Sequence, residues 1–386
     1  MKEKPLFLLV VFFYVAVVFI GNRIAVQGIN LPQHEPHEIA RATVQRVVDR
    51  TLPDIYLDAF DDPAETLDLL AMLGERLVFE ARINAGPRRG QVIVAEQSLG
   101  SFWGVVPREV AQGDRILLIN NNMGWFFDGH LLSTRLIVLG VLLVVFILLL
   151  GGRKGVNTII ALGLTLGGVF GVFIPSILAG WNIYLMALFV CVFTTIVTLT
   201  LVIGFNQKSL VAGIGCLGGI LVTVIITVIM DRLLFLTGMT DEHSRFLATL
   251  PIDHSINLRA IVFAGIIIGA MGAIMDVAMS IASSLWEVKE KARYITFDSL
   301  FRSGINIGRD MMGSMANTLI LAYIGTSLAL VLVLSVYTNS LMELFNIEMI
   351  AVEVLQAVAG SFGIIFSMPI TAFACAAIFS NEWERR

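Results

Sequence analysis

Eight apolar stretches, each close to the length that an α-helix needs to cross a bilayer, dominate this sequence. A hydrocarbon core of about 30 Å requires about 20 apolar residues in a helix. The stretches are Leu6–Ile20, Thr134–Leu150, Asn157–Leu178, Ile183–Ile203, Leu210–Met230, Leu258–Ser283, Asn317–Tyr337 and Val354–Phe379. Because 57% of the residues are hydrophobic, the chain lies outside the range of soluble globular domains. We expect an α-helical polytopic membrane protein with about eight transmembrane helices.

The first apolar stretch follows Lys2 and Lys4, a pattern that signal peptides share with uncleaved anchors. It ends in Gly21, Asn22 and Arg23 and lacks the small-residue pattern of a cleavage site. We therefore expect residues 1–27 to form a retained membrane anchor helix that starts translocation of the chain.

Residues 28–133 have the composition of a soluble domain with mostly extended patterns. Alternating apolar residues, a turn with glycine and proline, and a second extended run predict a hairpin from Leu77 to Ala95. Further predictions are a strand at Arg115–Ile119, a short helix from Asp61 to about Leu73, and an interfacial aromatic belt at Trp125, Phe126 and Phe127. Together they predict a small β-rich domain, a barrel or sandwich of OB-like form, between transmembrane helices 1 and 2.

The charges of the connections predict how the helices are oriented, because short loops rich in lysine and arginine stay in the cytoplasm. One side holds twelve such residues: Lys2, Lys4, Arg153, Lys154, Lys208, Lys289, Lys291, Arg293, Arg302, Arg309, Arg385 and Arg386. The other side holds three: Arg232, Arg245 and Arg259. We expect both termini in the cytoplasm, residues 28–133 outside, and residues 134–386 as a seven-helix transmembrane domain in the cell membrane.

A carboxylate interrupts the apolar stretch from Gly265 to Glu287. In a helix Asp276 would share one face with the residues at steps of four, namely Gly272, Ser280 and Ser284. An ionisable side chain at the bilayer centre costs about 2.5–3.5 kcal/mol on insertion scales, so it usually faces protein or water. Asp276 would lie about 27 Å from the outer end of its helix, towards the cytoplasmic leaflet. A helix-packing hydrogen bond is therefore an alternative to a functional role.

A second polar stripe lies within Ser303–Tyr323, which enters the next helix from the cytoplasmic side. At steps of three or four residues it contains Asn306, Asp310, Gly313 or Ser314, and Asn317. Arg309 is expected to pair with Asp276 or Asp310, since paired charges satisfy each other inside a membrane. The alternative is that Arg309 and Asp310 are ordinary interfacial charges.

Other patterns concern packing and excluded functions. Small residues at close-packing spacing predict closely approaching helices, at Gly163, Gly167 and Gly171, at Gly215 and Gly219, and at Gly265, Gly269 and Ala273. No nucleophile elbow, H-E-x-x-H, phosphate loop or long basic run is present, so we expect no enzyme, cofactor, bound metal or nucleic-acid partner. In the loop Thr240–His254, the charges of Asp241, Glu242, His243, Asp253 and His254 either gather cations or are simply solvated.

The two polar stripes lie in the strings IGAMGAIMDVAMSIASSLWE, from Ile268 to Glu287, and SGINIGRDMMGSMANTLILAYIGTSL, from Ser303 to Leu328. These strings resemble the two signature regions of the YibE/F-like multi-pass membrane family. The likeness extends to the architecture of one anchor, an extracytoplasmic β domain and a helical bundle. It implies a membrane or transport protein and supplies no catalytic residues.

We predict a permease or secondary transporter of unknown substrate, ion-coupled through the intramembrane aspartate. Its substrate- or ion-binding residues are predicted to be Asp276, Ser280, Asn306, Arg309, Asp310 and Asn317. The expected partners are the lipid bilayer and a small solute or ion, while a homo-oligomer or a partner membrane subunit remains open. The alternatives are a non-transporting scaffold or sensor whose β domain binds a ligand or partner, and an intramembrane enzyme with an aspartyl pair.

Overall fold

The computed structural model describes residues 3–27, 29, 38–51, 75–100, 108–121, 124–251, 254–292, 295–337 and 340–383. The chain forms two compact units, one from residues 1–32 and 146–386 and the other from residues 33–145. The predicted helix between Asp61 and Leu73 lies outside the described residues.

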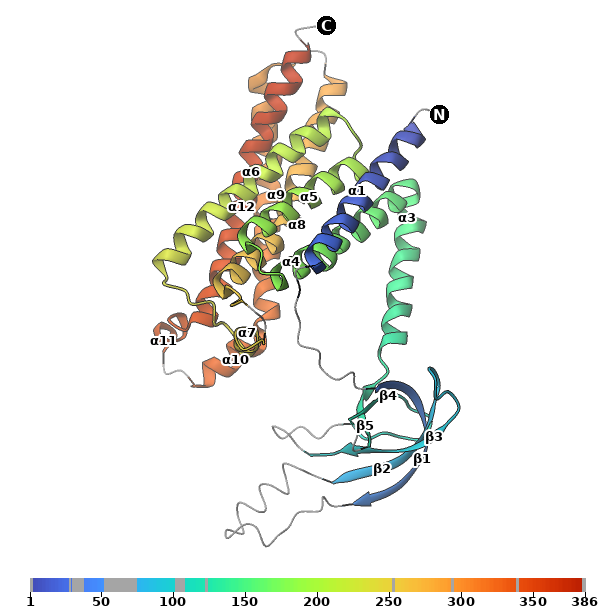
Figure 1. Ribbon diagram of the computed structural model, residues 1–386. Coiled ribbons are helices and arrows are strands. Elements are labelled where there is room, and N and C mark those ends of the chain that lie inside the picture. Colours follow the sequence, from blue (N-terminus) through green and yellow to red (C-terminus); the bar gives the residue numbers. More distant parts are fainter. Residues whose placement is uncertain are drawn as a thin grey trace. The chain divides into compact units, whose positions relative to one another are not determined.

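The smaller unit is built around a closed β-barrel (Figure 1). Its strands are β1 (Glu38–Thr51), β2 (Arg76–Ile83), β3 (Val92–Ser98), β4 (Arg115–Asn120) and β5 (Trp125–His130). Around the barrel they follow the order β1-β2-β3-β5-β4, with β3 and β5 parallel and the other neighbours antiparallel. The barrel form of the prediction is confirmed, and a barrel of five strands agrees with an OB-like form.

The barrel interior is filled by residues that alternate along the strands. The apolar positions of β2 are all buried: Leu77, Phe79, Ala81 and Ile83. Strand β2 pairs with β3, which confirms the predicted hairpin, and β4 confirms the predicted strand at 115–119. The predicted aromatic belt is wrong for Trp125, because this side chain is 9% exposed and packs in the barrel core.

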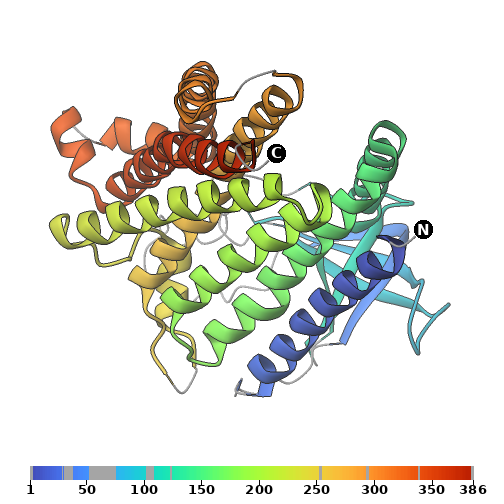
Figure 2. The same ribbon diagram turned by 90° about the horizontal axis from the view of Figure 1, so that it is seen from above.

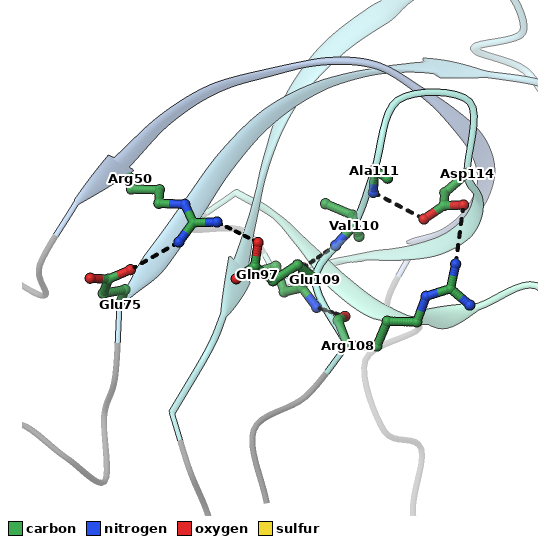
Figure 3. A network of polar contacts seen from close by, with 8 residues as sticks. All are labelled: Arg50, Glu75, Gln97, Arg108, Glu109, Val110, Ala111 and Asp114. Atoms are coloured by element: carbon green, nitrogen blue, oxygen red, sulfur yellow. Dashed lines mark hydrogen bonds and ion pairs between the residues drawn. The ribbon is translucent and has the colours of Figure 1, made fainter.

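A buried glutamine ties the segment before β4 to strand β3 (Figure 3). Gln97 is 1% exposed; its Nε2 donates to the Arg108 carbonyl oxygen at 2.8 Å and its Oε1 accepts from the Val110 N–H at 2.9 Å. Arg50 of β1 forms an ion pair with Glu109 of the same segment. The side chain of Gln97 thus satisfies backbone groups that no strand partner reaches, as buried polar groups require.

Replacing Gln97 with leucine should loosen the segment before β4, because the Arg108 carbonyl and the Val110 N–H would lose their partners. Each unsatisfied buried group costs about 1–3 kcal/mol, which corresponds to amide hydrogen exchange about 5- to 150-fold faster in this segment. Hydrogen exchange of the full chain, measured by mass spectrometry, provides the test. The exposed Gln91, replaced in the same way, is the matched control. Equal exchange in both variants would contradict a structural role for Gln97.

The larger unit is helical. Its elements are α1 (Glu3–Gln27), the second part of α3 (Ser133–Gly168), η3 (Val169–Phe173), α4 (Ile174–Leu178), α5 (Ile183–Val202), α6 (Gln207–Leu233), α7 (Glu242–Ala248), α8 (Leu258–Lys291), α9 (Phe297–Thr326), α10 (Leu328–Tyr337), α11 (Leu341–Phe345) and α12 (Glu348–Trp383). Seen from above (Figure 2), α1, η3, α5, α6 and α12 follow one another side by side, and each contacts the next. Helix α9 packs against α12, and α8 packs against α5, α6, α9 and α12.

Among the described helices, six are long and apolar enough to cross a membrane, and α9 with α10 makes a seventh if this bent pair is one span. The sequence predicts eight because it separates two apolar stretches that the structure joins in 46 residues, Ser133–Leu178. Gly152 breaks this stretch with φ 51° and ψ −128°. A Cβ added at Gly155 would lie 2.3 Å from the Ile147 carbonyl oxygen, so the chain comes close to itself just after the break. The number eight stays a prediction.

Helices α6 and α12 meet through glycines. A Cβ added at Gly215 would lie 1.8 Å from Thr371 Oγ1, and one added at Gly219 would lie 2.7 Å from the Gly363 carbonyl oxygen. The predicted close-packing face at Gly215 and Gly219 is therefore confirmed. Gly163 differs, because no described heavy atom lies within 4 Å of its Cβ position.

Replacing Gly219 with alanine should destabilise the helical unit, because the new Cβ would also lie 2.6 Å from Ile274 Cγ2. Overpacking of this kind costs about 1–3 kcal/mol. Gly163→Ala is the matched control, since it adds a methyl group to open space and should stabilise its helix by about 0.5–1 kcal/mol. Thermal unfolding in detergent should give a lower Tm for Gly219→Ala only. A Tm at or above the native value would show that α6 and α12 do not pack through this glycine.

Candidate functional site

Helix α8 places Asp276 on its uncovered side. Ile274 and Ile281 are fully buried in the main core, whereas Asp276 lies on the opposite face and is exposed. No described heavy atom lies within 4 Å of the Cβ position at Gly272, one turn before Asp276. Ser280, one turn after it, is half-buried. The polar face of α8 is therefore open around its carboxylate.

Helix α9 turns its glycines towards α12 and its polar stripe away from it. Cβ atoms added at Gly304 and Gly308 would lie 2.7 Å from Ala372 and 2.0 Å from Met368 of α12. The stripe begins two positions after Gly304, which is about 200° further around a helix. Its predicted site residues are all exposed: Asn306, Asp310 and Asn317.

The predicted two-helix site is not assembled in this conformation. All three charged residues are described, and Arg309 forms no ion pair with Asp276 or with Asp310. Arg309 is exposed. Gly304 and Gly308 pack against α12, and this contact sets the orientation of α9 about its own axis. The polar stripe of α9 therefore points away from α12. Arg309 is therefore not the counter-charge of Asp276 here.

Helix α9 ends in a sharp break. It stops at Thr326, and α10 starts at Leu328 at an angle of 62°. The predicted single helix Asn317–Tyr337 is therefore wrong. Ser327, at the break, is 6% exposed, and its hydroxyl oxygen has no hydrogen-bond partner among the described residues. A buried polar group without a partner costs about 1–3 kcal/mol and requires an explanation.

A cavity of about 640 Å³ lies beside this break. Helices α7, α8 and α12 and the α9–α10 break line it, with the polar residues Thr240, Asp241, Glu242, His243, Ser244, Thr326, Ser327, Glu353 and Gln356. We call it the acidic cavity, because its described wall carries the carboxylates of Asp241, Glu242 and Glu353 and no lysine or arginine.

Two carboxylates position the segment that forms one wall of the acidic cavity. Glu348, the first residue of α12, accepts hydrogen bonds of 2.7 Å from the N–H groups of Thr237 and Gly238 and from the Thr237 hydroxyl. Asp241 caps α7 and accepts from the N–H and the hydroxyl of Ser244 at 2.8 and 2.5 Å. The Ser244 hydroxyl holds the pKa of Asp241 below its usual value, so this carboxylate is charged at neutral pH.

The side of α8 that carries Asp276 starts in the wall of the acidic cavity. Gly265 lines the cavity, and Gly269, Gly272 and Asp276 follow on the same side of the helix. Asp276 lies about 16 Å beyond Gly265 along the helix axis. Between them, the Tyr323 hydroxyl of α9 lies 2.6 Å from the Cβ position of Gly269. Of the predicted packing glycines on α8, Gly269 thus contacts α9, whereas Gly265 borders open space.

Sequence patterns do not point to three residues of the acidic cavity, namely Ser327, Glu353 and Gln356. The apolar stretch begins at Val354 and leaves Glu353 outside, whereas α12 begins at Glu348 and includes it. A spacing of three residues then places Glu353 and Gln356 on one side of the helix. Within the described ranges, no group of three or more His, Cys, Asp or Glu side chains could hold a metal ion.

The comparisons with known proteins concern the region that holds this site. No curated protein and no solved structure matches the chain. A family model described as YibE/F-like protein matches residues 139–381, which is more than half of the 386 residues. The matched range contains Asp276 and every residue of the acidic cavity. The family expected from the two polar strings is confirmed, and the chain belongs to the YibE/F-like family.

Proposed function

We propose that this protein is an integral membrane permease or secondary transporter. Its substrate enters through the acidic cavity and moves along the side of α8 that carries Gly265 and Gly272, past Tyr323 of α9, to Asp276. Family membership and several long apolar helices support a membrane protein. The cavity and the polar face of α8 support transport as its activity.

The break at Gly152 favours eight crossings of the membrane. A helical stretch from Ser133 to Leu178 would be about 69 Å long, roughly twice the hydrocarbon thickness of a bilayer. Two crossings separated at Gly152 fit this length. The excess of lysine and arginine on one set of loops then orients both termini towards the cytoplasm. The acidic cavity would open on the extracytoplasmic side.

The observation that carries the proposal is the break of α9 at Ser327 beside the acidic cavity. Non-helical backbone at membrane depth is tolerated where it is buried in protein or lines a water-filled cavity. Broken helices are also typical of transporter sites, because their ends present free backbone groups to a substrate or ion. The break and the carboxylate of Glu353 belong to the same cavity wall.

Asp276 is a second polar group on the proposed route. A carboxylate facing lipid would cost about 2.5–3.5 kcal/mol, so an exposed Asp276 requires water or another protein surface. The half-buried Ser280 extends this polar face one turn further. Water that passes Tyr323 along the Gly265–Gly272 side of α8 and reaches Asp276 would meet this requirement and would let the carboxylate exchange a proton or an ion.

A non-transporting sensor or scaffold is the alternative function predicted from the sequence, and it needs a different structural feature. It requires a receptive surface on the barrel, whose interior is filled by its own side chains. The helical unit would then have no need of a polar face leading away from the acidic cavity. Flux measurements distinguish the two functions.

Replacing Asp276 with asparagine should slow flux at least about tenfold, because the exchangeable charge is lost while the shape is kept. The test uses purified protein in lipid vesicles and follows uptake and efflux of a panel of monovalent ions, divalent ions and small amines. Asp298→Asn is the matched control, since Asp298 is exposed and pairs with Arg302.

Equal flux through a correctly folded Asp276→Asn variant would remove Asp276 from the mechanism. A variant with a lower Tm and normal flux per folded molecule would favour a helix-packing role for this carboxylate. Native protein that moves no member of the panel in either direction would contradict transport.

A further inference from the structure

We propose that the acidic cavity binds an organic cation, an ammonium group attached to an apolar body, with Glu353 as its counter-charge. This inference rests on the proposed function, because it names the substrate class of the same route. Its support is the charge of the cavity wall, the size of the cavity and a buried hydroxyl without a partner.

The charge of the wall selects a cation. Asp241, Glu242 and Glu353 all line the cavity, and the part of its wall that the structure describes contains no lysine or arginine; its one histidine, His243, lies 3.2 Å from Asp241. A concave site lined by charges of one sign concentrates ligands of the opposite sign. Glu353 is half-buried on α12, so its charge is less screened by water than that of a fully exposed carboxylate.

The size and composition of the cavity favour an organic cation over a bare metal ion. Its volume of about 640 Å³ falls within the range of about 300–1,000 Å³ that is typical of small-molecule sites. Leu330, Met349 and Val352 contribute apolar surface to the wall. The described residues hold no cluster of three metal-ligating side chains, whereas Ca²⁺ requires six to eight oxygen ligands.

Ser327 supplies an observation that is independent of the acidic residues. It belongs to the cavity wall and is 6% exposed, and its hydroxyl oxygen has no partner among the described residues. A hydroxyl accepts a hydrogen bond from an ammonium group as readily as from water. The C-terminal end of α9, which carries a partial negative charge, lies at the same point of the wall. An ammonium group beside Glu353 would lie near Ser327, whose covered hydroxyl would accept a hydrogen bond from it after turning towards the cavity.

The test is binding of phenylbutylamine to the full chain in lipid nanodiscs, measured by isothermal titration calorimetry at neutral pH. Phenylbutanol has the same apolar body without charge, and phenylbutyrate has the opposite charge. We expect saturable binding of the amine alone. Glu353→Gln should weaken it about tenfold or more, because a charge-assisted hydrogen bond is lost, and Ser327→Ala should weaken it about two- to tenfold.

Two further variants keep the test decisive. Glu353→Asp retains the charge and should bind the amine better than Glu353→Gln does. Glu287→Gln removes an exposed carboxylate near the opposite end of α8 and should bind like the native protein. If Glu353→Gln does not fold, Ser327→Ala decides, and unchanged amine binding to it would overturn the proposal.

Three results would overturn the assignment of an organic cation: equal binding of all three probes, equal amine binding to native protein and folded Glu353→Gln, or saturable Ca²⁺ binding without amine binding. Because binding is measured without flux, its failure is distinct from that of transport. Amine binding that depends on Glu353, together with no flux in vesicles, would overturn the proposed function and leave the site intact.

Discussion

The close approach of α12 to α6 and α9 decides which faces of the helical unit are covered. Glycines make this approach possible, because a Cβ at Gly219, Gly304 or Gly308 would lie within 2.8 Å of a neighbouring helix. Rotating a helix that presents these glycines to α12 about its own axis would bring bulkier side chains against α12, where only glycine fits. The contact that stabilises α9 therefore also turns its polar stripe outward. Packing thus settles the direction of groups that take no part in it.

Two polar faces are left uncovered by this packing, and they differ in their surroundings. The face of α8 begins in the acidic cavity and leads to Asp276. The stripe of α9, with Asn306 and Asp310, is exposed on the side opposite α12. Neither face is suited to lipid, because charged side chains there cost several kcal/mol. The side of α8 that carries Asp276 starts at Gly265 in the wall of the acidic cavity, which is why the proposed route follows α8.

Sequence periodicity predicted those features that depend on one element alone. The alternation of apolar residues predicted strand β2 of the hairpin. The four-residue spacing predicted that Gly272, Asp276 and Ser280 lie on one face of α8. Both predictions hold because each periodicity is a property of a single strand or helix. The pairing of Arg309 with Asp276 required knowing which neighbour each face meets. That depends on glycine contacts between α9 and α12, which no local pattern contains.

The α9–α10 break and the carboxylate of Glu353 were missed for a related reason. Hydropathy treats 317–337 as one continuous apolar stretch, although Gly325 and Thr326 are weak helix formers just before the break. The same measure begins the last helix after Glu353, because a carboxylate lowers the average. A hydropathy average therefore leaves out of the predicted membrane helix a polar residue that the structure places in that helix.

Three features that lower the stability of the helical unit are explained if the acidic cavity holds a cation or water. A break in α9 gives up helical hydrogen bonds, a buried Ser327 hydroxyl lacks a partner, and Asp276 lies exposed on a helix of membrane length. Each costs on the order of 1–3.5 kcal/mol when nothing compensates it. Stability alone would favour replacing each of them by an ordinary apolar helix residue. The break and Ser327 line the acidic cavity, and Asp276 lies on the side of α8 that starts in its wall, which is the arrangement that the proposed transport route uses.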